Sequence, residues 1–410
     1  MFDVEKIRLD FPMLQNKSMQ GKPLVYLDNA ATTLKPQSVI DAICSYYQEY
    51  GANAHRGDYD LSYFVDQKYQ AVRQKCASFI NAKEKEIIYT SGATAGLNMV
   101  AYGYGRKVLK ENDIVLTTIA EHASCILPWM KVCQEQKAQL RYIDISKDGK
   151  LHLDTLEEMM NDHVKVIVLA HVSNVLGYEA PIQEISQMAH RYGAIVVVDG
   201  AQSVAHQKID VKALDCDFFA FSAHKMLGPT GIGILYGKSA LLKQMDPLFL
   251  GGDSNARYHQ NGEIILKDIP ECFESGTQPI AEIFGLGAAI DYLNQIGMDD
   301  IHAYEKELHD YAIRKMKQMD HVVLYHEDHD SGIITFNVKN IFAQDVATWF
   351  NVNGIALRSG QHCAKLLNEL LQCNATLRIS LYFYNTKAEV DYFLQVLQNT
   401  TMEHCLGAFF

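Results

Sequence analysis

Two charged side chains of opposite sign each follow a short apolar run near the middle of this sequence. Asp199 closes the run 195–198, and Lys225 lies just after the run 218–221, at the start of a turn rich in glycine and proline. Open α/β sheets bind ligands at the carboxyl ends of their strands, so we expect the carboxylate and the amine to meet there. A lysine for a Schiff base and an acid for a ring nitrogen are what pyridoxal phosphate requires. The pattern therefore predicts a site for this cofactor.

A second stretch, Ser91-Gly92-Ala93-Thr94, lies between an expected strand at 86–90 and an expected helix. Small residues at a helix N-terminus leave backbone N–H groups free, and the helix dipole favours an anion there. One interpretation is a cradle for a phosphate group. The other is simple capping of the helix by Ser91 or Thr94.

The composition is that of an ordinary globular protein with an acidic balance. The chain has 410 residues and a formal net charge of −12, which argues against a broad nucleic-acid surface and against binding to anionic membranes. Its nine cysteines form no CxxC pair and the N-terminus lacks a leader pattern, so we expect reduced thiols in a cytoplasmic protein. No apolar run approaches the roughly 18 residues of a membrane span. The segment 326–329 (HEDH) could ligate a metal, but a solvated loop is the better explanation, so no metal site is predicted.

The elements that must position these side chains alternate between strand and helix from residue 86 to residue 236. This order predicts an α/β fold with a mainly parallel, doubly wound sheet. The pattern then loosens into a smaller α+β region, with a polar, glycine-bearing stretch at 251–265 as a domain junction or exposed loop. Because the chain is long for one core, we expect a large cofactor-binding domain at 20–265 and a small domain formed by 1–19 and 266–410.

Eight segments in order resemble the motifs of the cysteine desulfurases, which are pyridoxal phosphate enzymes of fold type I in the class V aminotransferase group. The short RSGQHCA segment is similar to the SufS-type (group II) branch rather than to the branch with a longer loop. The segments are SGAT at 91–94, EHAS at 121–124, HVSNVLG at 171–177, VVVDGAQS at 196–203, FSAHKMLGPTGIG at 221–233, ESGTQP at 274–279, RSGQHCA at 358–364 and RISLYFYNT at 378–386.

The resemblance implies roles around the cofactor. Lys225 would carry it covalently, and Asp199 would pair with the ring nitrogen. Gln202 would bind the ring hydroxyl, and His122 would stack on the ring and move protons. The remaining cofactor contacts would be Thr94, Ser222 and His224 to the phosphate, Asn174, and Thr277 to the phosphate of the other subunit of a homodimer with shared sites.

The resemblance also implies the reaction. Arg378 and Asn174 would hold the carboxylate of L-cysteine, an anion that the arginine fork suits. Cys363 would take the substrate sulfur as a persulfide, release alanine and pass the sulfur to a SufE- or SufU-like acceptor for iron–sulfur cluster assembly. Arg358, His55 and Arg56 complete the expected substrate-binding set, although solvent exposure is the other interpretation of the loop 51–63.

The sequence departs from the family pattern after Gly276-Thr277, where Gln278-Pro279-Ile280 follow, and at three further places. Gln361 replaces a usual histidine, Ala95 replaces an acid, and the loop 251–262 has an unusual form. Selenocysteine lyase or cysteine sulfinate desulfinase activity is an alternative, because the same site can cleave other bonds at Cβ. A catalytically inactive scaffold for sulfur transfer is an alternative of another class. Retention of Lys225 and Cys363 together argues against it.

Overall fold

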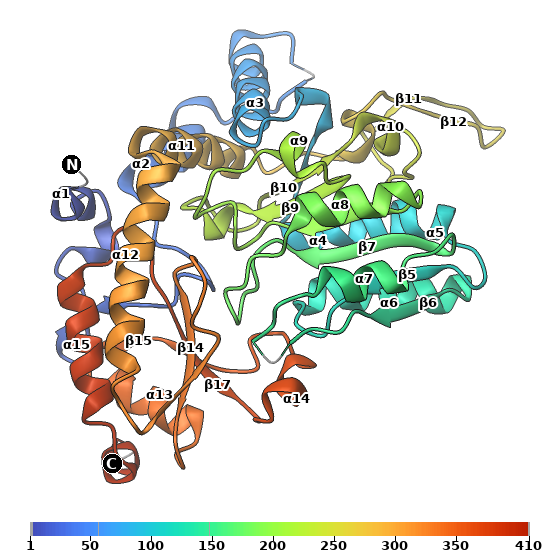
Figure 1. The fold of residues 1–410 in the computed structure, drawn as a ribbon. Helices are drawn as coiled ribbons and strands as arrows, with labels where there is room; N and C mark the ends of the chain where they lie inside the picture. The colour runs from blue at the N-terminus through green and yellow to red at the C-terminus, as the bar shows by residue number, and fades with distance from the viewer. Residues whose placement is uncertain (1–2, 56, 147, 409–410) are drawn as a thin grey trace.

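A seven-stranded sheet forms the centre of the larger part of the molecule, shown by a computed structural model that describes residues 3–55, 57–146 and 148–408 (Figure 1). The strand order is β4-β10-β9-β8-β7-β5-β6, and only β10 runs antiparallel to its neighbours. The strands are β4 (Ile87–Thr90), β5 (Ile114–Thr117), β6 (Gln139–Tyr142), β7 (Val164–Ala170), β8 (Ile195–Asp199), β9 (Phe218–Ser222) and β10 (Gly233–Gly237).

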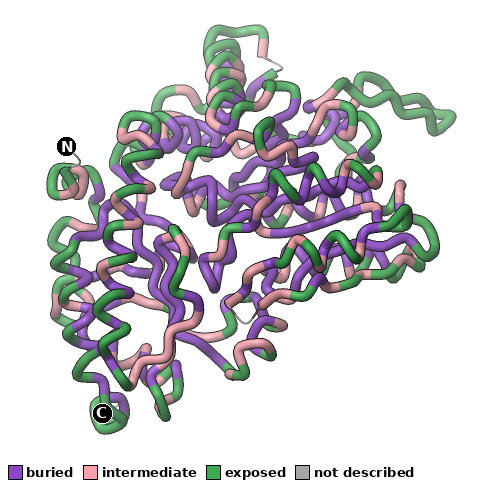
Figure 2. Tube along the Cα trace, in the orientation of Figure 1, coloured by how far each residue is buried: buried purple, intermediate pink, exposed green. Residues whose placement is uncertain are grey.

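Helices cover both faces of this sheet, because its central strands are apolar on both sides. Alternate residues of β8 feed two separate cores: Val196 and Val198 pack on one face, and Ile195 and Val197 on the other. In Figure 2 the central strands are accordingly almost continuously buried. The first face is covered mainly by α2 (Gln37–Ser45), α3 (Asp60–Phe79), α8 (Ile182–Arg191) and α11 (Ile280–Ile296), and the second by α4 (Ala93–Met99) and α6 (Ala123–Gln136).

A smaller antiparallel sheet with its own core lies beside the large one. Its order is β13-β14-β17-β16, and helices pack against it. The elements are α12 (Met298–Met316), β13 (Val322–Tyr325), β14 (Ile333–Val338), α13 (Ala343–Val352), β16 (Arg358–Gly360), β17 (Thr376–Ser380), α15 (Lys387–Gln398) and α16 (Met402–Gly407). The predicted fold class, a mainly parallel α/β sheet with a smaller α+β part, is confirmed.

Two segments cross between these parts. Strand β3 (Val25–Tyr26) pairs in parallel with β15 (Ile355–Ala356), and Val25 and Leu27 are buried in the core of the smaller sheet. Helix α11, which follows the predicted boundary at 265, packs against α2 and α3 of the larger part. The division at 20–265 itself stays a prediction.

The polar stretch at 251–265 is an exposed hairpin of β11 (Asn255–Tyr258) and β12 (Ile264–Leu266), which projects from the body of the protein (Figure 1). An Asn-Gly turn closes it: Gly262 has φ +89°, a conformation that glycine adopts without strain. The turn chemistry therefore makes a hairpin of a segment that composition alone marked as a loop.

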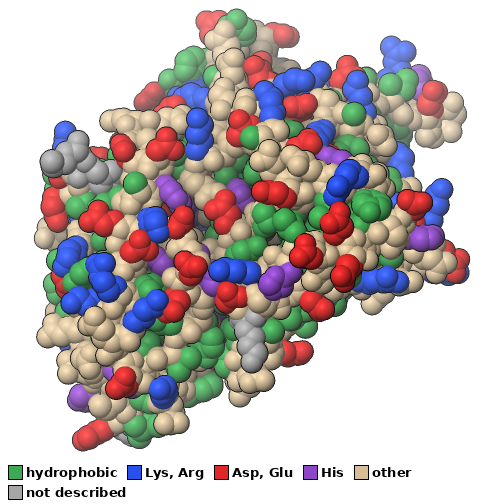
Figure 3. All heavy atoms as spheres, viewed as in Figure 1, with side chains coloured by type: hydrophobic (Ala, Val, Ile, Leu, Met, Phe, Trp, Pro, Cys, Tyr) green, Lys and Arg blue, Asp and Glu red, His purple; other side chains and the backbone are tan. Residues whose placement is uncertain are grey.

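The surface carries both signs of charge. Basic and acidic side chains are interspersed over the face in Figure 3. Among the residues that the structure describes, no helix has both the length and the apolar character needed to cross a membrane.

Candidate active site

A cavity of about 200 Å³ opens at the carboxyl ends of the parallel strands. Eight of the residues predicted from the sequence line it together: Thr94, His122, Asn174, Asp199, Gln202, Ser222, His224 and Lys225. They come from five separate connections of the sheet, and they meet because parallel strands end at one edge.

Lys225 and Asp199 form the charged centre of this cavity. Burial lowers the pKa of Lys225 to about 8, and the Asp199 carboxylate opposes that shift. Asp199 is itself fixed, since its Oδ1 accepts the Ala201 N–H at 2.9 Å and its Oδ2 accepts the Cys125 thiol at 3.6 Å. The amine is therefore available in its neutral form near pH 8, beside an oriented carboxylate.

His122 lines the same cavity as Lys225 and Asp199, at the start of α6. It is the N-cap of that helix, and its Nδ1 accepts the Ser124 N–H at 3.1 Å, so the ring proton is on Nε2. Burial lowers the pKa of His122, which keeps the ring neutral. A neutral imidazole held in one tautomer is suited both to stacking on a ring and to moving a proton.

Hydroxyl and backbone donors gather at the end of the cavity near α4. Ser222 Oγ accepts the Ala93 N–H at 2.8 Å, and Thr94 Oγ1 lies 2.7 Å from Ser124 Oγ. Gly92 precedes the helix with φ +147°, and a Cβ there would come within 3.2 Å of Ser222 Oγ. Burial together with Lys225 and Lys35 lowers the pKa of His224 to about 4, so its ring is neutral as well. This end of the cavity therefore offers hydroxyl and N–H hydrogen-bond donors, and the His224 ring among them is neutral.

Arg378 lies on β17, at the place where the small sheet meets the cavity. Its side chain is only 3% exposed, its Nη1 donates to the Asn174 carbonyl at 2.7 Å, and its buried Nε has no partner. Asn174 in turn donates through Nδ2 to the His362 carbonyl at 2.8 Å. Arg378, Asn174 and the Cys363 loop are thus connected by hydrogen bonds.

The Cys363 loop returns the chain from β16 to the edge of the cavity. His362 and Cys363 both have positive φ, at 49° and 59°, which is uncommon for residues other than glycine. Besides the bond from Asn174, two contacts hold the loop in this conformation: Ala123 N–H donates to the Cys363 carbonyl at 2.8 Å, and His362 Nε2 lies 3.0 Å from Thr376 Oγ1. Cys363 itself is exposed, whereas Cys125 beside Asp199 is buried. The charge of a Cys363 thiolate would act on the cavity, where it raises the pKa values of Lys225 and Arg378.

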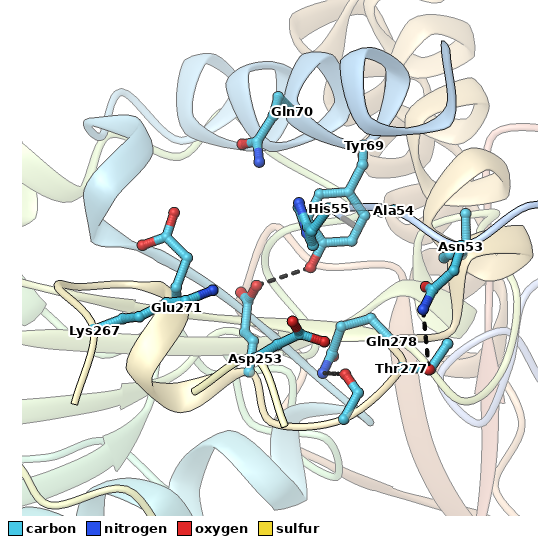
Figure 4. A pocket seen from close by; sticks show the side chains of 13 residues that line it. Asn53, Ala54, His55, Tyr69, Gln70, Asp253, Lys267, Glu271, Thr277 and Gln278 are labelled. Carbon is cyan, nitrogen blue, oxygen red and sulfur yellow. Dashed lines mark hydrogen bonds between the residues drawn. The ribbon is translucent and has the colours of Figure 1, made fainter. Parts of the chain in front are cut away.

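Two predicted site residues line a different pocket, of about 240 Å³, in the same chain (Figure 4). His55 packs edge-on against Tyr69 and pairs through Nδ1 with Asp66 at 2.6 Å. Thr277 accepts a long hydrogen bond of 3.5 Å from Asn53. Within one chain these residues are therefore separate from the Lys225 cavity. Arg56 lies outside the described residues.

Comparison with known proteins agrees with this geometry. The family model described as aminotransferase class-V matches residues 25–393. The chain belongs to that family. It is 44% identical over 399 residues to a probable cysteine desulfurase of Halalkalibacterium halodurans (97% of this chain, 98% of the other), and 43% identical to one of Synechocystis (96% and 94%).

Two solved cysteine desulfurases have the same fold as this class-V aminotransferase family member. The apo enzyme of Thermococcus onnurineus superposes with a TM-score of 0.91 at 36% identity, covering 96% of this chain and 97% of the other. Escherichia coli CsdA gives 0.91 at 33% identity, covering 99% of both chains. The predicted family and enzyme class are thereby confirmed.

The cavity also fits pyridoxal phosphate, the cofactor of this family. The decisive atom is Gln202 Oε1, which is buried without a hydrogen-bond partner although Gln202 Nε2 donates to the Ala30 carbonyl at 3.0 Å. An acceptor of this kind matches the ring hydroxyl of the cofactor. With an amine, a carboxylate and a group of neutral donors around it, the cavity has the polar groups that the cofactor requires.

Sequence reasoning missed several side chains around this class-V aminotransferase site. Ser124 contacts both Thr94 and His122, and its place in the EHAS motif was the available signal. Asp28 lies between Arg358 and Arg378, and Lys35 donates to the His224 carbonyl. Neither could be identified from spacing, because their partners lie about 190 to 350 residues away in the chain. The interpretation of 326–329 as a solvated loop is wrong for His326, which is buried and bound to the Leu176 carbonyl.

Proposed function

We propose that this chain is an L-cysteine desulfurase that converts L-cysteine to L-alanine and leaves a persulfide on Cys363. The observation that carries the proposal is the placement of Cys363, an exposed thiol on a constrained loop bound to the same helix end that presents His122 to the cavity. A class-V family member without this reaction would not need a thiol at that position.

The residues divide the work as follows. Pyridoxal phosphate, when bound, holds the amino acid by its amino group and draws electrons away from Cα. Arg378 binds the substrate carboxylate with its buried fork, and Lys225, released as a neutral amine, takes the proton from Cα. Neutral His122 precedes Ala123, which binds the sulfur loop, and it can supply a proton to the substrate carbon.

Sulfur transfer then takes place at Cys363. The thiolate attacks the substrate sulfur, so that an S–S bond forms as the Cβ–S bond breaks. The electron pair of the broken bond stays on the substrate Cβ, where a proton completes the methyl group, and the proton that Lys225 took is returned to Cα to give alanine. The positions of Ala123 and Thr376 support the proposal because they hold the loop in place for this attack.

The direct test measures alanine and sulfide released from L-cysteine by the holoenzyme, together with the mass of the protein after one turnover. Wild type should form alanine and gain one sulfur on the peptide that contains Cys363. Cys363→Ala should lose both, while Cys44→Ala, which removes another exposed thiol, should behave as wild type. Unchanged alanine formation in Cys363→Ala would exclude the persulfide mechanism. Selenocysteine and cysteine sulfinate, assayed in parallel, decide between the desulfurase and its alternatives.

We infer further that the active form is a homodimer with shared sites. Thr277 lies in the pocket with His55 rather than in the Lys225 cavity, as expected if it completes the site of a second copy. The nearby hairpin also exposes apolar side chains, with Tyr258 at 74% and Ile264 at 52%. Mixing the inactive variants Lys225→Ala and Thr277→Asp should restore activity, because one site of the mixed dimer then has both native residues. No recovery would contradict shared sites.

The short loop around Cys363 supports a place in the SufS-type branch, with a SufE- or SufU-like acceptor and iron–sulfur cluster assembly as the destination of the sulfur. In this loop the thiol is exposed and three residues separate it from the short helix α14 (Leu367–Leu371). An acceptor can therefore approach without a long mobile arm. Faster alanine formation in the presence of such an acceptor, with the persulfide moving from Cys363 to it, is the expected result.

A further inference from the structure

Two arginines of the small sheet lie opposite each other next to Asn174, a residue that lines the cavity. Arg358 on β16 and Arg378 on β17 are direct cross-strand partners, so their side chains lie on the same face. Like charges in this arrangement destabilise a sheet. The environment is also unfavourable for a cation, since burial and Arg358 together lower the pKa of Arg378 to about 10.

Asp28 supplies the opposite charge between them. Its Oδ2 pairs with Arg358 through Nη2 at 3.1 Å and Nε at 3.2 Å, and its Oδ1 pairs with Arg378 Nη2 at 3.4 Å. The Asp28 side chain is 17% exposed. A bridge between Asp28 and Ser380 fixes its backbone beside the end of β17. The acid is therefore built into the arginine pair.

The two halves of this bridge are unequal. The contacts to Arg358 are shorter, and Arg358 is 47% exposed, whereas the single contact to Arg378 is long. Arg378 also has a buried Nε without a partner. The two arginines and Asp28 together have a net charge of +1, so the group can bind one further carboxylate at Arg378.

We propose that Asp28 is an internal counterion that the carboxylate of the incoming amino acid displaces from Arg378, so that the charge of Asp28 limits the affinity of the site for amino acids. The inference rests on the proposed use of Arg378 as the carboxylate-binding residue. After displacement Asp28 stays paired with Arg358, which keeps the two guanidinium groups apart. Asp28 acts on the substrate through Arg378 and is a specificity-determining residue rather than a catalytic one.

Binding of L-alanine to the holoenzyme tests this, followed by the change in visible absorption of the bound cofactor. Asp28→Asn keeps the shape and removes the charge, so the Kd for L-alanine should fall by about five- to tenfold, as expected for a unit charge a few ångströms away at partial exposure. Asp28→Glu, which keeps the charge, should bind no more tightly than wild type. The amide of L-alanine, which lacks the carboxylate, should bind Asp28→Asn and wild type equally.

The control variant is Glu135→Gln, which removes one acid from the pair with Arg106 at the far end of α6 and should leave the Kd unchanged. If Asp28→Asn does not accumulate as folded protein, Asp28→Ser makes the same comparison. An unchanged or higher Kd in the uncharged variant overturns the proposal. So does an equal gain in affinity for the amide.

L-Alanine binding involves no sulfur chemistry, so the two proposals can fail separately. If Asp28→Asn binds L-alanine more tightly than wild type but wild type forms no alanine from cysteine, the desulfurase function alone is contradicted. A wild-type protein that turns over cysteine while Asp28→Asn shows no gain in affinity contradicts the counterion alone. If wild type and Asp28→Asn both turn over cysteine, the KM for cysteine should be lower in Asp28→Asn, and the kcat of the variant should not exceed that of wild type.

Discussion

The backbone N–H of Ala123 donates to the carbonyl oxygen of Cys363 at 2.8 Å. This bond joins the first residue of α6 to the loop that carries the proposed sulfur acceptor, 240 residues later in the chain. Because His122 is the N-cap of the same helix, one helix end positions both the ring-facing imidazole and the thiol. This hydrogen bond therefore links the placement of His122 directly to that of Cys363.

Replacing Ala123 by proline should loosen the sulfur loop and leave helix α6 intact. Proline is tolerated at the first helical position, and His122 has the extended backbone (φ −60°, ψ 145°) that a residue before proline prefers. The loss of one hydrogen bond, about 1 kcal/mol, should slow persulfide formation on Cys363 about fivefold. Single-turnover mass spectrometry measures the rate. Ala123→Gly, which keeps the N–H, is the control and should be close to wild type, and equal rates in all three proteins would contradict the role.

Recombination of the cofactor-free protein with pyridoxal phosphate should depend on pH through Lys225. Since its pKa is lowered to about 8, the neutral amine accumulates as the pH rises through 8, and the rate should level off above that value. Asp199 raises this pKa, so Asp199→Asn should move the midpoint to lower pH. Stopped-flow absorption follows the reaction. A midpoint at the ordinary lysine value of 10.5 would show that Lys225 is not the buried amine described here.

The buried pair of Arg73 and Glu274 should be important for stability. Arg73 Nη1 and Nη2 donate to the two carboxylate oxygens of Glu274 at 2.8 and 2.7 Å, and both side chains are less than 5% exposed. Glu274→Gln leaves a buried guanidinium without its counterion, so the free energy of unfolding should fall by about 3–5 kcal/mol. The exposed pair Lys75–Asp291 is the comparison, and Asp291→Asn should cost less than about 1 kcal/mol. Similar losses in the two variants, measured by chemical unfolding, would contradict this account.

Glu121 should make the folded protein less stable at higher pH. It is a buried carboxyl that accepts hydrogen bonds from Thr118 Oγ1 at 2.7 Å and Ala170 N–H at 2.6 Å, and burial raises its pKa from 4.5 to about 7. Between those values the folded chain holds a proton that the unfolded chain has released. Its contribution is therefore lost as the pH rises from 4.5 to 7, by about 3 kcal/mol in total.

Glu121→Gln removes that proton and should remove this part of the pH dependence. Relative to wild type, the variant should gain stability as the pH rises from 5 to 8, a difference visible in thermal midpoints across that range. A constant difference between the two proteins over the whole range would mean that Glu121 titrates at an ordinary pH in the folded state.

The order of strands and helices and the content of the central cavity follow closely from the sequence. The apolar runs before Asp199 and Lys225 end at one sheet edge because parallel strands must do so. Signals of this kind are local in the sequence, because a strand, its terminal polar residue and the next turn lie within a few residues of each other. This explains why the strand pattern alone places Lys225 and Asp199 at one site, whereas Gln202 and Ser222 were expected there from the family resemblance.

Contacts between distant segments were decided only by the tertiary structure. Asp28 reaches Arg358 and Arg378 because β3 pairs with β15 and Asp28 bridges to Ser380 at the end of β17. Ala123 reaches Cys363 because the small sheet lies beside the cavity. Thr277 and His55 share a pocket apart from Lys225. For Thr277 the resemblance already implied a role in the other subunit, but the separation of His55 was not expected from the sequence. By itself, the sequence determined the chemical groups and the sheet edge where they gather. Pairing across hundreds of residues depends on how the two sheets pack against each other, and that decided which carboxylate faces which arginine and where the thiol is held.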